Sequence, residues 1–253
     1  MTGGGPAASV RARPPRSRAT LFAVGAVAWL LVAALLALGT WQVQRLGWKQ
    51  ALIARVDARV HAPAVPAPAP GPGAAGWTGL TRENAEYTHV RVTGRWLRDR
   101  SVRTQAATVL GSGSWLLTPL RTPAGWTVLV NRGFVPIGWT EPPATGDALV
   151  TVTGLLRITE PHGGFLRTND PAADRWYSRD VAAIAAARRL SAVAPYFIDA
   201  AADPAVPARP PVGGLTIIAF PNNHLTYAIT WYVLAIMVAG GWMILLRHER
   251  RLR

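Results

Sequence analysis

The sequence contains no cysteine, and this absence excludes several kinds of chemistry. Disulfides, thiolate zinc sites, cysteine nucleophiles and copper transfer through thiols are all ruled out. Histidine is left as the nitrogen ligand for a metal, and the chain has only five: His61, His89, His162, His224 and His248. Any metal site built on nitrogen therefore depends on these few imidazoles.

Acidic residues are scarce, with 13 Asp and Glu against 27 Lys and Arg, which gives a formal net charge of +14. All of the basic residues except Lys49 are arginines, and they are scattered along the chain or gathered at its ends. A nucleic-acid surface would show a basic stripe interleaved with aromatic residues, and the sequence has no such stripe. We therefore expect no nucleic-acid partner and relate the charged ends to membrane topology.

Catalytic motifs are missing as well. The sequence has no GxSxG, no HExxH, no phosphate-binding glycine loop and no dinucleotide fingerprint. Asp170 and Asp174 lie in a turn-like NDPAAD segment, where caps and turns are the usual explanation. His89 is expected on the solvent face of a strand and His162 in a turn, and neither has a second ligand at metal spacing. The pattern predicts that the chain is not an enzyme.

Two long apolar runs dominate what is present, at residues 19–38 and 220–246. Each has the ~20 residues that a helix needs to cross a bilayer. Arginines precede the first run and follow the second: Arg11, Arg13, Arg16 and Arg18 on one side, Arg247, Arg250, Arg251 and Arg253 on the other. Basic residues stay in the cytoplasm, so both termini are predicted inside and the intervening segment outside. A signal peptide cleaved near Ala37-Leu38-Gly39 is the alternative for the first run, although signal peptides usually carry only ~7–15 apolar residues.

The sequence thus predicts an α+β membrane protein in which two transmembrane helices flank one mostly antiparallel β extracytoplasmic domain. The helices are placed at residues 19–39 and 222–246, and the domain at 40–221. Residues 1–18 are predicted to be a disordered basic cytoplasmic tail, and residues 247–253 a second basic tail.

Within the domain, alternating apolar and polar residues predict strands, and an alanine-rich stretch predicts one helix. The strands are expected at residues 87–97, 114–120, 126–131, 148–158 and 195–199, and the helix at 179–190. Gly154 is expected at a bulge. Residues 62–76 read as an unstructured Pro/Ala/Gly spacer, and residues 203–211 as a second proline-rich linker.

The second apolar run places an imidazole, a phenol and an indole on one face of its helix. His224, Tyr227 and Trp231 follow helical spacing, with alanines continuing the face. Asn222 or Asn223 is expected to cap this helix. The positive end of a helix favours neutral imidazole, which is the form that binds a metal. Interfacial anchoring of these amphipathic side chains is the alternative explanation.

The residues after the first run continue as a helix. Trp41, Arg45, Trp48 and Leu52 share one face. Arg45 and Lys49 can reach lipid phosphates or a carboxylate-bearing ligand. Anchoring at the bilayer surface is the alternative explanation for Trp41, Trp48, Arg45 and Lys49.

Four blocks, in this order and spacing, resemble the Surfeit locus protein 1 family of cytochrome c oxidase biogenesis factors. They are LGTWQVQRLGWK after the first apolar run, YTHVRVTGRW, LVNRGFVP and NNHLTYAITWYVLA at the start of the second. Phe134 stands where the family usually has tryptophan, which preserves a packing role and puts any role of an indole N–H in doubt. The Pro/Ala spacer looks like an insertion specific to this lineage.

This resemblance implies an assembly factor that binds haem a and assists its insertion into subunit I of a haem–copper oxidase. It matches the family's haem-ligating histidine to His224, so Tyr227 and Trp231 are expected to flank the macrocycle. Charge complementarity adds Arg45 or Arg132 as partners of the haem propionates. The implied partners are cytochrome c oxidase subunit I, the lipid bilayer and, as a further candidate, haem a synthase. The implied location is a bacterial plasma membrane.

Three other functions stay open. A haem-free membrane scaffold would dock oxidase subunits through its outer domain and use His224 at an interface. A membrane-tethered sensor would need a cytoplasmic output domain, for which the tails are short. An enzyme of unrecognised type would need a nucleophile–base pair or a metal constellation that the motifs do not supply.

Overall fold

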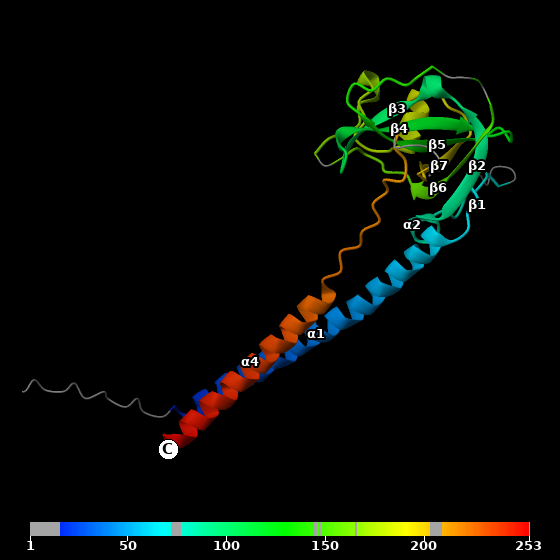
Figure 1. Cartoon of the computed structure of the whole chain (residues 1–253). Helices are drawn as coiled ribbons and strands as arrows, with labels where there is room; N and C mark the ends of the chain where they lie inside the picture. The colour runs from blue at the N-terminus through cyan, green and yellow to red at the C-terminus, as the bar shows by residue number, and fades with distance from the viewer. Residues whose placement is uncertain are drawn as a thin grey trace, which may run out of the picture. The chain divides into compact units, whose positions relative to one another are not determined.

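The computed structural model describes residues 16–71, 77–143, 146, 148–164, 166–202 and 209–252. Most of the predicted N-terminal tail, the end of the Pro/Ala/Gly spacer and most of the second linker lie outside the described residues. The chain forms two compact units, one made of the N-terminal part up to Leu52 together with Phe220–Arg253, the other of Ile53–Ala219. Figure 1 shows the elements of both units.

The first unit is a pair of helices. Helix α1 spans Arg18–His61 and helix α4 spans His224–Arg251. Both are long and apolar enough to cross a membrane. Helix α1 continues without a break beyond its apolar part, as the spacing after residue 39 predicts, and its last residues belong to the second unit.

Helices α1 and α4 pack antiparallel, with small residues facing large ones. Val32 and Leu35 of α1 form a buried cluster with Ala235 of α4. A Cβ atom on Gly25 would come within 2.6 Å of the Trp242 ring, and one on Gly39 within 2.7 Å of the Tyr232 ring. Glycine at these two positions therefore allows the aromatic side chains of α4 to lie directly on the α1 backbone.

The second unit is built on a seven-stranded sheet in the order β1-β2-β6-β7-β5-β4-β3. The strands are β1 Val65–Pro66, β2 His89–Trp96, β3 Val102–Thr108, β4 Gly111–Arg121, β5 Thr127–Pro136, β6 Val150–Ile158 and β7 Val193–Ala200. An additional pairing of β2 with β4 closes β2, β6, β7, β5 and β4 into a barrel. Among the described strands, only β1–β2 and β5–β7 pair in parallel, so the prediction of a mostly antiparallel domain is confirmed.

Short helices lie on or beside the barrel. They are α2 Arg82–Ala85, η2 Arg98–Arg100, η3 Pro171–Ala173 and α3 Val181–Ala187. The predicted helix at 179–190 is confirmed as α3, where the Asp180 carboxylate accepts a hydrogen bond from the Ala183 N–H at 3.1 Å. Asp170 caps η3 in the same way, which confirms its predicted capping role.

Alternation along the strands divides the domain into two cores. Val128 and Val130 of β5 point into the barrel cluster, whereas Leu129 between them packs with Phe197 outside the barrel and under α3. The second core includes Val181 and Ile184 of α3. Strand β5 is therefore apolar on both faces, because both faces are covered.

Two predictions for this domain are wrong. Gly154 is not at a bulge: its pairing with Val90 is regular, and a Cβ atom there would lie 2.1 Å from the Asp199 carbonyl oxygen. Glycine is needed for that close approach. The spacer is not unstructured between residues 65 and 68, because β1 pairs with β2 and the Pro68 carbonyl accepts the Tyr196 hydroxyl at 2.6 Å.

Candidate functional site

The candidate site is centred on His224, the first residue of α4. Asn223 occupies the cap position, as predicted, but its side chain makes no capping hydrogen bond. The His224 ring is half-buried, and its Nδ1 lies 2.8 Å from the Oε1 atom of Gln42 on α1. This hydrogen bond joins the two helices of the first unit.

The contact with Gln42 determines which ring nitrogen carries the proton. An amide oxygen only accepts hydrogen bonds, so Nδ1 of neutral His224 must be the donor. Within the described part of the chain, Nε2 has no hydrogen-bond partner, and its lone pair is available. Histidine ligands of metals are typically held in this way, with the second ring N–H donated to a fixed acceptor.

Two further polar atoms near the start of α4 are buried without a partner among the described residues. They are Oδ1 of Asn222 and Nε1 of Trp231. Trp231 packs against the cluster of Val32 and Leu35, whereas Tyr227 is 54% exposed. Native proteins pair nearly all buried polar atoms, so unpaired ones mark places where a bound molecule or water completes the bonding.

Arg45 lies close to the histidine contact along α1. It follows Gln42 by three residues, about 4.5 Å along the helix axis, and therefore lies on the same side of α1. Its guanidinium stacks on Trp48 at 4.9 Å and on Trp41 at 6.0 Å. Among the ion pairs of the described residues, none involves Arg45, so its charge is available to an anionic ligand.

Arg132, unlike Arg45, lies away from the helix that carries Gln42 and already has an ion-pair partner. It lies on β5 in the second unit, and its guanidinium contacts the Glu141 carboxylate and the Trp96 ring. Glu141 also binds Arg98 at 2.7 Å. The predicted role of Arg132 toward a propionate thus stays a prediction, for a residue that already shares a carboxylate.

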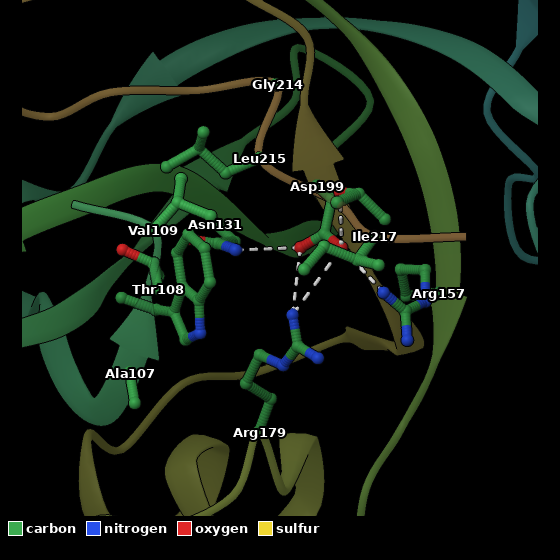
Figure 2. Close-up of a pocket in the computed structure, with 12 residues that line it drawn as sticks. Ala107, Thr108, Val109, Asn131, Arg157, Arg179, Asp199, Gly214, Leu215 and Ile217 are labelled. Carbon is green, nitrogen blue, oxygen red and sulfur yellow. Dashed lines mark hydrogen bonds and ion pairs between the residues drawn. The ribbon is translucent and has the colours of Figure 1, made fainter. Parts of the chain in front are cut away.

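The β domain contains a cavity of about 450 Å³ (Figure 2). Its wall combines apolar side chains such as Val109, Leu215 and Ile217 with a polar base. At that base Asp199, whose side chain is 3% exposed, binds Arg157 at 2.8 Å and Arg179 at 3.2 Å. Figure 2 shows both guanidinium groups directed at this carboxylate.

The ionic groups of this network satisfy one another. Arg157 also binds Glu86 at 2.8 Å, and Arg179 binds Glu160 at 2.6 Å. Burial acts to lower the pKa of Arg157, but Asp199 and Glu86 outweigh it and hold that pKa above its ordinary value. No atom of the network is among the buried polar atoms that lack a partner in the described residues. The network therefore presents no free group to a ligand.

The cavity network instead holds the segment that leads from the barrel toward α4. The Thr216 hydroxyl donates to Asp199 at 3.0 Å, and Val212 exchanges two backbone hydrogen bonds with Phe134, each of 2.9 Å. Asn131 donates to Asp199 at 2.7 Å and accepts from the Gly133 N–H at 3.1 Å. Residues 212–216 are thus held by hydrogen bonds to the LVNRGFVP block and to Asp199.

Two neighbouring residues of that block, Gly133 and Phe134, have a clear packing role. A Cβ atom on Gly133, whose φ is +127°, would lie 2.1 Å from the Val212 carbonyl oxygen. Phe134 is buried and packs edge-on against Trp115, with ring centroids 6.3 Å apart. The packing role expected for an aromatic residue at position 134 is therefore confirmed.

Sequence reasoning missed Gln42. It lies inside the LGTWQVQRLGWK block, one turn before Arg45, but the helical face inferred from the sequence runs through Trp41, Arg45, Trp48 and Leu52 and does not include it. A polar side chain three residues after Gly39, at the end of an apolar run, was the signal that could have found it. Groups of three or more His, Cys, Asp or Glu that could bind a metal are absent from the described residues.

These features define a class of protein: a closed β-barrel domain inserted between two apolar, membrane-length helices, one of which begins at a histidine held by the other. Comparison with known proteins makes this class more specific. The family model described as "SURF1 family" matches residues 29–236. The chain belongs to the SURF1 family.

Named relatives agree with that assignment. Surfeit locus protein 1 of Homo sapiens is 34% identical over 226 residues, covering 81% of this chain and 71% of the relative. Its Mus musculus counterpart is 33% identical, covering 84% and 72% respectively. A SURF1-like protein of Monosiga brevicollis is also 33% identical, covering 83% and 82%. The resemblance of the four sequence blocks to this family is confirmed.

Proposed function

We propose that this protein is an assembly factor for a haem–copper cytochrome c oxidase, and that it binds haem a as cargo and assists its insertion into subunit I. The observation that carries the proposal is the state of His224, with Nδ1 held by Gln42 at 2.8 Å and Nε2 open. An imidazole presented in this way is a standard axial ligand for haem iron.

The surroundings of His224 fit an amphipathic, anionic porphyrin. Tyr227, one turn after His224 on the same face of α4, is 54% exposed and offers its ring to an apolar ligand. Arg45, one turn from Gln42 on α1, supplies a cation for a propionate. The unpaired Trp231 N–H and Asn222 carbonyl are further polar groups in the same region.

Within this proposal the residues bind and orient, and they transfer no group. His224 ligates the iron, Arg45 neutralises a propionate, and haem a brings the redox chemistry that it performs later in the oxidase. The protein is accordingly not an enzyme. Subunit I receives the cargo, and haem a synthase is the further candidate partner as its source.

The same proposal places the protein in a bacterial plasma membrane. Helices α1 and α4 would span the bilayer, with both basic termini in the cytoplasm and the β domain outside. Trp41 and Trp48 suit the aromatic belt at the outer interface. The helical pair with Gly25 and Gly39 at its contacts has the small-residue packing typical of helices in lipid.

The test is a reduced-minus-oxidised absorption spectrum of the purified protein from a host that makes haem a. The wild type is expected to carry a haem a signal, and His224→Ala is expected to lose it. His248→Ala is the matched control, because His248 is exposed near the other end of the same helix. Haem retained in the His224 variant would contradict the proposed ligand.

A haem-free docking scaffold is the second candidate, and exposed apolar side chains on the β domain favour it. Val109, Ile137 and Leu166 are each more than 80% exposed. If this is the function, His224→Ala will restore oxidase activity fully to a deletion strain, whereas substitution of these three residues by serine will not. Haem a in the wild type that depends on His224 would decide against it.

A further inference from the structure

The hydrogen bond between Gln42 and His224 is a cross-helix contact made at a defined place. Gly39 and Thr40 lie within one turn of Gln42, and both contact Tyr232 of α4. Thr40 Oγ1 lies 3.2 Å from the Tyr232 hydroxyl. The register of the two helices is therefore fixed next to Gln42, and its amide is held opposite the imidazole.

The acceptor that faces His224 is neutral, and this has a chemical consequence. A carboxylate in the same place would make the imidazole a stronger, more electron-donating ligand. A leucine would leave both ring nitrogens without direction, so that either one could carry the proton. An amide oxygen does neither: it fixes the tautomer without adding a charge beside the bound metal.

We infer that Gln42 is a positioning residue, which holds His224 with Nε2 toward the haem iron and, being uncharged, keeps the iron–histidine bond weak enough for the haem to be released. This inference rests on the proposed function. It gives a carrier the two properties that it needs, since the cargo must be bound in one orientation and must later leave.

A simpler role would be a polar contact that only stabilises the helix pair, as polar side chains do in membrane proteins. That role predicts a loss of stability and a shift of the histidine tautomer, because any such bond fixes Nδ1–H, but no change in haem affinity or in the reduction potential of the bound haem. The two roles therefore differ in the haem titration and in the reduction potential, while the tautomer measurement shows whether the hydrogen bond exists in solution.

The test compares Gln42→Leu, Gln42→Glu and the control Gln44→Leu in the full-length protein in detergent. Gln44 lies on the same helix and is exposed. With histidine ring nitrogens labelled, NMR of the haem-free protein at about pH 8 reports the tautomer of His224. The wild type and Gln44→Leu are expected to show the proton on Nδ1, and Gln42→Leu a mixture of both tautomers.

Titration with haem a gives the second readout. Gln42→Leu is expected to bind about 10–100-fold more weakly, the usual effect of losing a residue that orients a metal ligand. Gln42→Glu is expected to lower the reduction potential of the bound haem and to slow its transfer to apomyoglobin, used as a haem trap. Gln44→Leu should match the wild type in every readout.

The outcomes separate the inference from the proposed function. An unchanged tautomer, affinity and reduction potential in the Gln42 variants, with haem bound to the wild type, would overturn the inference and leave the haem carrier standing. A tautomer that depends on Gln42 in a wild type that takes up no haem a would overturn the proposed function and support the hold of Gln42 on the imidazole.

Discussion

Two polar regions of this molecule handle their hydrogen bonds in opposite ways. Around Asp199, two arginines and their carboxylate partners satisfy one another completely. At the start of α4, His224 uses one ring nitrogen, and Asn222 and Trp231 each bury a polar atom without a partner in the described residues. The comparison separates a polar cluster closed by its own hydrogen bonds and ion pairs from a region in which buried polar atoms have no partner among the described residues.

The largest loss of stability is expected when the satisfied network is disrupted at Asp199. Asp199→Ala leaves Arg157 and Arg179 buried without their shared carboxylate, and should reduce the free energy of unfolding by about 3–5 kcal/mol. Thermal unfolding of the full-length protein in detergent, followed by tryptophan fluorescence, measures the loss. Asp57→Ala, at an exposed carboxylate on α1, serves as the control and should stay within about 0.5 kcal/mol.

A somewhat smaller effect is expected at Gly133. Gly133→Ala adds a Cβ atom 2.1 Å from the Val212 carbonyl oxygen at a φ of +127°, so strain and collision together should cost about 2–4 kcal/mol. Gly111→Ala has a similar φ of +100° but meets nothing within 4 Å, and isolates the strain. Limited proteolysis around residues 212–216 should accelerate in the first variant only. Equal effects in both variants would show that the close approach of Val212 to Gly133 adds nothing to the cost of the substitution.

The smallest effect concerns an exposed ion pair, and it sharpens the contrast with the buried network. Burial acts to raise the pKa of Asp174, but hydrogen bonds from Arg188 and Trp176 outweigh it and leave that pKa below its ordinary value. A carboxyl with a depressed pKa stabilises the fold above its unfolded pKa of about 3.9, and the effect disappears as the pH falls through the folded pKa. Because the side chain is 56% exposed, less than about 1 kcal/mol is at stake.

Asp174→Asn tests this pH dependence. The stability difference between wild type and variant should be largest above about pH 5 and should shrink as the pH falls below the unfolded pKa of about 3.9 and through the lower folded pKa. Unfolding curves recorded across this range measure it. A difference that grows on acidification would mean that the pKa of Asp174 is raised in the folded state and not lowered.

The strands of the barrel could be located from sequence, because the apolar pattern of each strand is visible in its own residues. Val90 and Val92 alternate with polar neighbours, and the apolar run from Thr127 marks a strand covered on both faces. Strand β3 was missed because Thr104 and Ala106, which point inward there, are small and weakly apolar. Barrel closure was out of reach as well, since the pairing of Trp96 with Leu120 joins strands whose periodicity does not record the partner.

The residues of the candidate site also differ in whether local sequence alone reveals them. His224 could be singled out because an imidazole at the mouth of an apolar helix is unusual in itself. Gln42 could not, because its meaning depends on a contact across 182 residues of chain. The sequence places Asp199 only at the end of a short strand, and the folded barrel brings Arg157 and Arg179 to it.

The closed barrel also limits how a partner can recognise this domain. Strand addition needs a long row of unpaired backbone groups at a sheet edge. Here β1 is only Val65–Pro66, and the Gln105 N–H of β3 already donates to the Trp176 carbonyl at 2.8 Å. Among the described strands, one edge is thus only two residues long, and the other is interrupted at Gln105. A protein that docked on this domain would therefore recognise mainly its side chains, so that single surface substitutions would weaken such docking, and strand exchange is disfavoured at these edges.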